Sequence, residues 1–337
     1  MQAQDYGSAK WSVGARVRGA TDVSVEQAFA AGRILRTHVL RPTWHFVLPA
    51  DVRWLLAATA PRIRARDARR YAELGLDAAT LRRAASAFAE ALHGGHGLTR
   101  AEMAAVLAGA GIPSEGQRMP YMLMNAELDG LICSGARRGK QQTYMLLDER
   151  APDAPRVSRD EALGKLASRF FAGHGPATVK DLAWWASLTL AEARAGVERA
   201  GERLRSEEVG GMTLWHGREE GARARAARSA GPAGRGAPSV RLVQGYDEYL
   251  IGYAETRSLL AAPGSSWVAA TPPVGRLVIL KDGRVSGFWR RTVEKSRALL
   301  EAELIDDWSD LAREALAAEA ERFGRFLGLA VEVVTTG

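Results

Sequence analysis

Two glutamines near the start of the chain are the first residues whose types and spacing could do chemistry. Gln2 and Gln4 are separated by one residue in the segment MQAQDY, residues 1–6. On an extended backbone, side chains at i and i+2 leave the same face, so the two amides would point together. Each amide offers one carbonyl acceptor and two N–H donors, so the pair can hold a water molecule or a base edge. Two glutamines in a polar segment are also a common accident, so the motif gains weight only from the architecture around it.

A second cluster, TWHF, occupies residues 43–46. In a strand, period-2 alternation would put Thr43 and His45 on one face and Trp44 and Phe46 on the other. An aromatic strand usually belongs to a core, but an aromatic face could also pack against an unstacked base.

A third cluster combines YDEY at residues 246–249 with FWRR at residues 288–291. The carboxylates of Asp247 and Glu248 could do acid–base work. A carboxylate pair beside two arginines more often forms an ion-pair network, which here would close a barrel. The pattern leaves both interpretations open.

Metal and cofactor sites have no support in the sequence. The six histidines lack ligand spacing, and the only cysteine, Cys133, stands alone in an apolar run. The chain shows no P-loop, dinucleotide fingerprint or nucleophile elbow. His96 and His174 both lie between glycines, so we interpret them as turn residues. We therefore expect no metal and no cofactor.

Composition sets broad bounds on the class of protein. The 337 residues include 46 Lys and Arg against 39 Asp and Glu, a net charge of +7, and the pI is about 9.8. That balance suits a polyanionic partner, although the arginine-rich composition weakens the argument. One cysteine excludes an internal disulfide and favours a reducing compartment. Because no apolar run reaches the ~20 residues of a membrane span, we predict a soluble protein of the bacterial cytoplasm, associated with the nucleoid.

The elements that must position these clusters begin with a small α/β unit. Ser24 can cap a helix with apolar residues at helical spacing. Residues 37–48 (THVLRPTWHFVL) read as two short β-rich runs around Arg41-Pro42, which predicts a hairpin. A further helix is expected from about Pro49.

The chain then repeats itself. Gly-His-Gly occurs at residues 95–97 and again at 173–175, 78 residues apart, each time after a predicted helix (81–92 and 161–171). Thr99 and Thr178 can cap the next helix of each copy, and third helices are expected at about 117–128 and 190–200. Hairpins at 131–147 and 205–216 close both copies. This order is the winged-helix layout, a DNA-binding module that also serves as a protein-binding or purely architectural module.

The first of these hairpins has a basic tip. Arg137, Arg138 and Lys140 lie within GARRGKQQ, residues 135–142. Cations at such a tip suit contacts with the DNA backbone, which position a protein without reading sequence, although a solvated turn would look similar.

The C-terminal part of the sequence has a different pattern from the helical repeats before it. Residues 219–239 are rich in Ala, Gly and Arg without apolar periodicity and read as a linker. From Val240 the chain alternates short strand candidates, with an Asp-Gly hairpin signal at 282–283 and one helix at about 311–327. We predict a small sheet or partly open barrel.

These motifs together resemble the HTH-42 superfamily of winged-helix proteins, which contains the AlkZ and YcaQ DNA glycosylases. The residues that carry the resemblance occur in order through the whole chain: QAQDY at 2–6, THVLRPTWHFV at 37–47, YDEYLIGY at 246–253 and DGRVSGFWRRT at 282–292. The resemblance implies three winged-helix units and a C-terminal β-barrel, arranged in a C-shape that takes duplex DNA. It also implies excision of alkylated purines through a Q-x-Q or Q-x-D motif and, for AlkZ-type members, unhooking of interstrand crosslinks.

Carried onto this sequence, the resemblance makes Gln2 and Gln4 the catalytic pair. We assign Gln4 to hold the water and Gln2 to orient the water or the lesion. Asp5 ranks third, because on an extended segment it faces away from the two amides. Tyr6 joins Asp5 and residues 43–45 as a candidate contact to lesion or DNA. The family pattern also has a longer stretch before Q-x-Q, so we expect the first winged helix to be incomplete and favour an internal start.

The sequence therefore predicts an α+β chain of tandem winged-helix units, the first one incomplete, followed by a β-barrel-like domain. The expected domains are residues 1–78, 79–150, 151–218 and 240–337, with the linker at 219–239. The expected function is a monofunctional DNA glycosylase, a monomer acting on double-stranded DNA that contains N7-alkylated purines, with no membrane partner. The alternatives are a non-catalytic winged-helix DNA-binding protein and an inactive scaffold. Which adduct is preferred, and whether crosslinks are unhooked, stays open.

Overall fold

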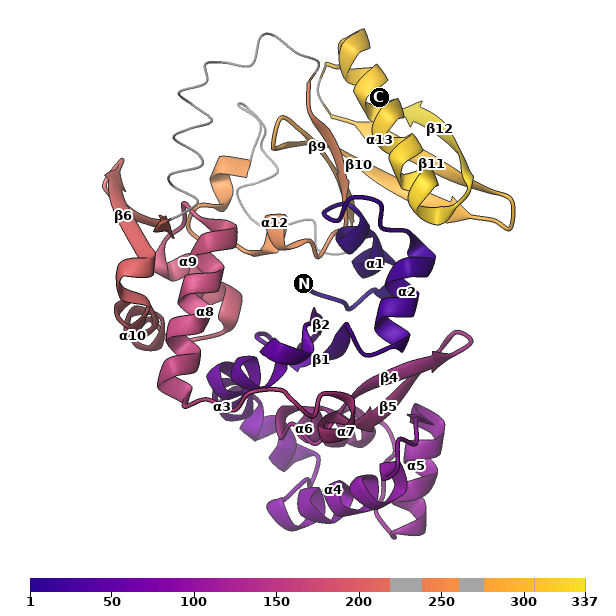
Figure 1. Ribbon diagram of the computed structural model, residues 1–337, viewed down its shortest axis with the longest axis vertical. Coiled ribbons are helices and arrows are strands. Elements are labelled where there is room, and N and C mark those ends of the chain that lie inside the picture. Colours follow the sequence, from indigo (N-terminus) through magenta and orange to yellow (C-terminus); the bar gives the residue numbers. More distant parts are fainter. Residues whose placement is uncertain (219–237, 261–275, 306, 337) are drawn as a thin grey trace. The chain divides into compact units, whose positions relative to one another are not determined.

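The computed structural model describes residues 1–218, 238–260, 276–305 and 307–336 as a mixed α+β chain (Figure 1). It separates into two compact units. The terminal unit comprises Met1–Glu26, Ala167–Trp185 and Ala200–Gly337, and the central unit comprises Gln27–Leu166 and Ala186–Arg199. Across the described ranges, the search for a helix with the length and apolarity of a membrane span finds none.

The central unit begins with the predicted hairpin. Strands β1 (Leu35–Val39) and β2 (Thr43–Val47) pair antiparallel, with Thr37 opposite His45 and His38 opposite Trp44. Helix α2 (Asp22–Ala30) ends earlier than the apolar spacing suggested, because Leu35 already belongs to β1. Helix α3 (Pro49–Glu73) follows, with its proline at the first turn, where a missing N–H costs nothing.

The rest of the central unit is a set of helices closed by a second hairpin. Its elements are α4 (Ala78–Leu92), β3 (Leu98–Thr99), α5 (Arg100–Gly109), α6 (Arg118–Leu128), β4 (Ile132–Arg138), β5 (Gln141–Leu146) and α7 (Leu147–Arg150). Thr99 caps α5, as the sequence predicts, and the structure adds a capping box with Glu102. The three strands form a sheet of order β3-β5-β4.

A similar order of elements follows, and its residues are divided between the two units. These elements are α8 (Arg159–His174), α9 (Val179–Ala186), α10 (Leu190–Ala200), the 3₁₀ turn η1 (Gly201–Arg203), β6 (Leu204–Val209) and β7 (Met212–Gly217). Thr178 caps α9 by accepting from the backbone N–H of Asp181 at 3.2 Å, while the Asp181 carboxylate accepts from the N–H of Thr178 at 3.0 Å. The third helices and both hairpins therefore lie close to where the repeat placed them.

The C-terminal part of the terminal unit is an open sheet. Its elements are β8 (Val240–Val243), α12 (Glu248–Ile251), η2 (Arg257–Leu260), β9 (Leu277–Lys281), β10 (Arg284–Val293), β11 (Arg297–Leu304), α13 (Asp310–Leu327) and β12 (Ala330–Thr336). The strand order is β12-β11-β10-β9-β8, and every pair is antiparallel except β11 with β12.

The expectation of a β-barrel-like domain is therefore wrong for the described residues, since β8 and β12 are the two edges of the sheet. Helix α13 is the reason, because it connects β11 to β12 as a crossover and so returns β12 parallel to β11. The apolar face of α13 then covers the sheet (Figure 1). Phe323 packs edge-on against Trp289 of β10, with ring centroids 5.3 Å apart.

The predicted five-segment division stays a prediction. Almost all of the predicted linker, 219–237, and the strand candidate at 267–268 lie outside the described residues. The two compact units cut across the division, because the first residues of the chain group with its last hundred or so. That grouping is what positions the Q-x-Q motif.

Candidate active site

The Q-x-Q motif leads into helix α1 (Tyr6–Gly14). Asp5 is the N-cap of α1, and its carboxylate accepts from the backbone N–H of Ser8 at 2.6 Å. The chain bends at Gln4 and Asp5, and Asp5 keeps extended backbone angles before α1 begins. Gln2 is 5% exposed, whereas Gln4 is exposed. The two glutamines therefore occupy different environments, one inside the unit and one at its surface.

The main chain of Gln2 is held from both sides by the segment after β8. Its N–H donates to Oε1 of Glu248 at 2.8 Å, and its carbonyl accepts from Nε2 of Gln244 at 3.2 Å. The other carboxylate oxygen of Glu248 accepts from Nε1 of Trp185 at 2.6 Å. Because both oxygens of Glu248 have protein donors, this residue acts on the position of Gln2 rather than as an acid or base.

Helix α1 is fixed to the C-terminal elements by Trp11. This side chain is 1% exposed and donates from Nε1 to the carbonyl of Leu242 at 2.7 Å. Its ring meets Phe323 and Phe326 of α13 edge-on, at centroid distances of 5.0 and 5.3 Å. The aromatic contacts and the hydrogen bond together tie the motif helix to both β8 and α13.

Asp247 makes a second anchor on α1. This buried carboxylate takes a two-point ion pair from Arg16, at 2.6 and 3.0 Å, and a hydrogen bond from Ser12 at 2.9 Å. Arg291 instead donates to Ser8 at 2.9 Å and lies 3.7 Å from Asp5; burial lowers the pKa of its guanidinium. The contacts of the described residues therefore favour ion pairing over acid–base work, but with partners near the N-terminus: Asp247 and Arg291 contact α1 and its flanking residues instead of each other.

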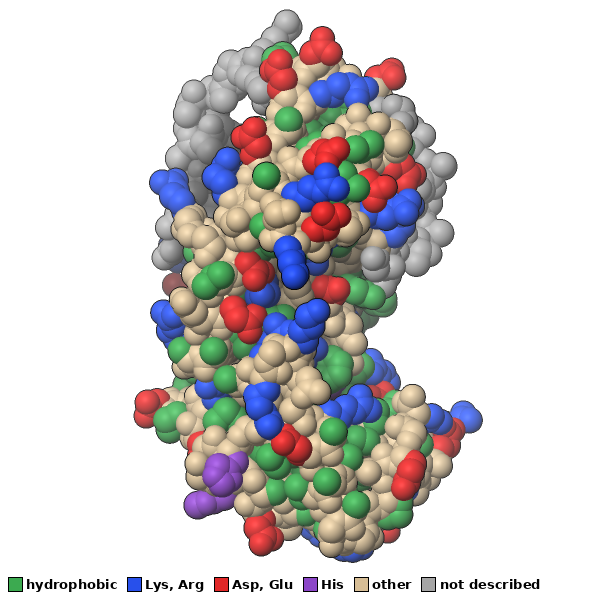
Figure 2. Space-filling model, turned by 90° about the vertical axis from the view of Figure 1, so that its right-hand side faces the viewer, with side chains coloured by type: hydrophobic (Ala, Val, Ile, Leu, Met, Phe, Trp, Pro, Cys, Tyr) green, Lys and Arg blue, Asp and Glu red, His purple; other side chains and the backbone are tan. Residues whose placement is uncertain are grey.

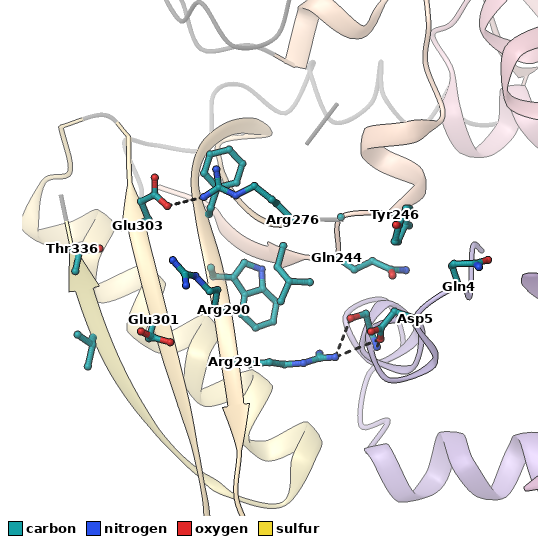
Figure 3. Close-up of a pocket in the computed structure, with 16 residues that line it drawn as sticks. Gln4, Asp5, Gln244, Tyr246, Arg276, Arg290, Arg291, Glu301, Glu303 and Thr336 are labelled. Atoms are coloured by element: carbon teal, nitrogen blue, oxygen red, sulfur yellow. Dashed lines mark hydrogen bonds and ion pairs between the residues drawn. The ribbon is translucent and has the colours of Figure 1, made fainter. Parts of the chain in front are cut away.

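A cavity of about 1200 Å³ opens beside Gln4 within the terminal unit. Gln4, Asp5 and Gln244 lie toward one end of it, and side chains of β9 to β12 line the other (Figure 3). At the sheet end, Arg276 pairs with Glu303 at 2.7 Å and lies 3.6 Å from the ring centroid of Phe288. The cavity thus combines amides, arginines and aromatic faces. Gln2 does not line it.

The TWHF cluster belongs to the central unit, so the structure assigns it to a different compact unit from the motif. Trp44 donates from Nε1 to Glu127 at 3.3 Å, and its ring contacts Arg36 at 4.3 Å and His38 at 4.5 Å. These contacts favour the packing role for Trp44. His45, the next residue of β2, is fully buried.

The basic hairpin tip is partly used for internal contacts. Arg138 pairs with Glu102 and donates to the carbonyl of Gly97 at 2.9 Å. Arg138 and the capping contacts lower the pKa of Glu102 to about 2. Arg137 donates to the carbonyl of Lys140 at 3.1 Å, and Lys140 is exposed at the turn. On the face in Figure 2, cations and anions are intermingled rather than gathered by sign.

Tyr6 opens α1 and is half-buried, with Nζ of Lys10 5.4 Å from its ring centroid. Among the described residues, no group of three or more His, Cys, Asp or Glu side chains is placed to hold a metal ion. Burial raises the pKa of the Cys133 thiol to about 12. His174 is the end of α8 rather than a turn residue; it stacks on Phe170 at 4.6 Å, and burial lowers its pKa.

Sequence reasoning missed the residues that hold the motif, namely Gln244, Glu248 in its clamping role and Trp185. It also missed Arg276, which lines the cavity. The YDEY cluster was the available signal, because a charged pair inside an apolar strand region needs partners. The sequence did not show that those partners are the first sixteen residues.

The comparisons with known proteins bear on this geometry. A model of the AlkZ-like DNA glycosylase family matches residues 1–326. The chain belongs to this family.

Two relatives from Streptomyces sahachiroi accompany the AlkZ-like family match. The solved structure of a DNA glycosylase AlkZ superposes with a TM-score of 0.78 at 23% identity, covering 99% of this chain and 91% of that one. This likeness shows the shared fold. A curated protein named "Interstrand DNA cross-link repair glycosylase" is 24% identical over 221 residues, or 59% of this chain. The matched stretch spans 53% of that relative's length.

Proposed function

We propose that this AlkZ-like protein is a monofunctional DNA glycosylase that hydrolyses the N-glycosidic bond of N7-alkylated purines in double-stranded DNA. The observation that carries the proposal is the clamped Q-x-Q segment, with Gln2 fixed by Glu248 and Gln244 and with Gln4 presented to a cavity. We extend the proposal to unhooking of interstrand crosslinks, because the curated relative is named as an interstrand DNA cross-link repair glycosylase.

Hydrolysis of this glycosidic bond needs little help from a general acid or a general base. An N7-alkylated guanine is cationic, so the ring leaves as a neutral base once the C1′–N9 bond breaks and its electron pair returns to the ring. A water oxygen forms the new bond to C1′, and its proton passes to solvent. The remaining demands are to place that water and to stabilise positive charge at C1′, and carbonyl dipoles of fixed amides meet both demands.

Within this proposal, exposed Gln4 holds the water, and buried Gln2 orients the water or the lesion. Their different burial supports this division, because only Gln4 lines the cavity. Asp5 is committed to capping α1 and to Arg291, so we give it a positioning role. Tyr6 remains a proposed lesion contact.

DNA binding follows from the helix-and-hairpin segments, which we propose are winged-helix units. Arg137, Arg138 and Lys140 would contact phosphates from the β4–β5 tip. Lys140 is the best placed for this, because Arg138 already pairs with Glu102. Thr43 is a proposed lesion or DNA contact, whereas Trp44 supports the hairpin through Glu127. His45 is fully buried, so we propose a supporting role for it in place of a direct DNA contact. The proposed active form is a monomer.

A strand-break assay tests the proposal. The protein is incubated with duplex DNA carrying N7-methylguanine, and alkali then cleaves at the abasic sites. We expect breaks with wild type and none above background with a Gln2→Ala/Gln4→Ala double variant that still melts cooperatively. Equal cleavage by both proteins would refute the proposal that the protein is a glycosylase. Salt-dependent DNA binding without cleavage would favour a non-catalytic DNA-binding protein instead.

A further inference from the structure

Gln244 is a buried amide beside the motif that the proposed chemistry has not yet used. It follows β8 directly and is 0% exposed, yet it lines the same cavity as Gln4. Its Nε2 donates to the carbonyl of Gln2 at 3.2 Å. Its Oε1 has no hydrogen-bond donor among the described residues.

The contact with Gln2 decides which end of the Gln244 amide is the oxygen. If the amide were turned over, its oxygen would face the carbonyl oxygen of Gln2, and two acceptors repel each other. The nitrogen therefore stays on Gln2, and the oxygen is the group left over. In Figure 3 the amide end of Gln244 extends toward Gln4 and Asp5.

A buried acceptor without a donor is unfavourable, so the site is built for a ligand that brings an O–H or N–H. Because the oxygen is itself buried, neighbouring groups must shift to admit a donor, and one water molecule needs a smaller shift than the edge of a purine. Gln4 stands at the same end of the cavity with a second amide.

We propose that Gln244 is a third amide of the active site, whose Oε1 accepts a hydrogen bond from the attacking water while Gln4 holds the same water. This inference rests on the proposed glycosylase function. Two acceptors would fix both O–H bonds of the water, which leaves an oxygen lone pair directed at C1′. Gln244 thereby couples the placement of the water to the placement of Gln2.

The test uses the full chain with a Gln244→Met variant, which keeps the length and the apolar stem and removes the amide. Single-turnover release of N7-methylguanine should slow by about two- to twelve-fold, the loss expected for one neutral hydrogen bond. Gln27→Met, the same change at an exposed position of α2, is the matched control and should leave the rate unchanged.

A second measurement separates water positioning from a merely structural role. With methanol added, the positive sugar is trapped either by water or by methanol, and the ratio of methyl glycoside to abasic product is counted. Once the products of a protein-free reaction are subtracted, this ratio does not depend on how much of the variant is folded. We expect wild type to form little methyl glycoside, and Gln244→Met to move the ratio toward that of uncatalysed depurination.

An unchanged ratio, or an unchanged rate, for Gln244→Met would overturn the inference while leaving the glycosylase proposal intact. For example, the Gln2→Ala/Gln4→Ala variant could lose excision while Gln244→Met keeps the wild-type rate and ratio. That result would support the glycosylase proposal and reject the role of Gln244. If wild type releases no N7-methylguanine, both proposals fail together.

Discussion

Replacing Glu248 by glutamine changes one oxygen into an NH₂ group and keeps the shape of the side chain. In the structure, the two carboxylate oxygens accept from the backbone N–H of Gln2 at 2.8 Å and from Nε1 of Trp185 at 2.6 Å. An amide oxygen can take the place of only one of them, so the other N–H would face an NH₂ group. Gln2 and Trp185 are 5% and 8% exposed, so water does not readily replace the lost acceptor.

The size of the effect follows from that lost acceptor. A buried N–H left unpaired costs about 1–3 kcal/mol. If this cost appears wholly as misplacement of Gln2, base release slows by about 5- to 150-fold, at about 1.4 kcal/mol for each factor of ten. The assay is single-turnover release of N7-methylguanine from duplex DNA with protein in excess, which removes product release from the measured rate.

Two further variants make the result specific. Glu255→Gln removes a surface ion pair with Lys180 by the same substitution and should leave the rate unchanged. Adding Trp185→Phe to Glu248→Gln removes the competing donor, so the amide oxygen can serve Gln2 and the rate should partly recover. A Glu248→Gln variant as fast as wild type would refute the clamp.

Three other predictions concern separate parts of the chain. A Cβ on Gly14 would overlap the Phe326 ring, so Gly14→Ala should lower the melting temperature through about 1–3 kcal/mol of overpacking. In an NMR titration, Glu102 should show a pKa of about 2, and Arg138→Ala should move it toward 4.5. Because the folded pKa lies below the unfolded one, the stabilisation from this pair is complete above pH 4.5 and is lost as the pH falls toward 2. Cys133 is buried, with its pKa raised to about 12, so a thiol reagent at neutral pH should label it only after unfolding.

Each of these three has its own control. Gly7→Ala is on the same helix, and its added Cβ would lie at an ordinary 3.4 Å from the Arg291 side chain, so the melting temperature of this variant should match wild type. A wild-type melting temperature for Gly14→Ala as well would contradict the packing argument. If the pKa of Glu102 in the Arg138→Ala variant equals the wild-type value, the ion pair with Arg138 is excluded as its cause. Labelling of native protein at the unfolded rate would show that Cys133 is accessible.

Local signals predicted much of the fold, because caps and hairpins are decided by neighbouring residues. The Thr99 N-cap and the helix at Leu190–Ala200 lie where the sequence placed them. Strand β11 (Arg297–Leu304) was missed because Ala, Leu and Glu favour helices, and its alternating burial becomes visible only beside β10. The parallel pairing of β12 with β11 was missed for a related reason, because it is a long-range contact that depends on the crossover helix α13.

The sequence predicted the two glutamines of the candidate site, but it did not predict the residues that hold them in place. Gln2 and Gln4 stand out by spacing, and the family resemblance gave them a role. Their burial differs because segments more than two hundred residues away contact them, as Glu248 and Gln244 do with Gln2. No periodicity in a single sequence records a pairing of that range.

The rate of base release by Gln4→Ala is the measurement that tests the central claim most directly. Duplex DNA with one N7-methylguanine is mixed with excess protein, and binding is followed in parallel by fluorescence anisotropy. We predict a loss of about tenfold or more in the rate of base release, with DNA affinity unchanged, because Gln4 acts on the water and not on the phosphates. Equal rates for wild type and Gln4→Ala would contradict the assignment of the Q-x-Q motif as the catalytic centre.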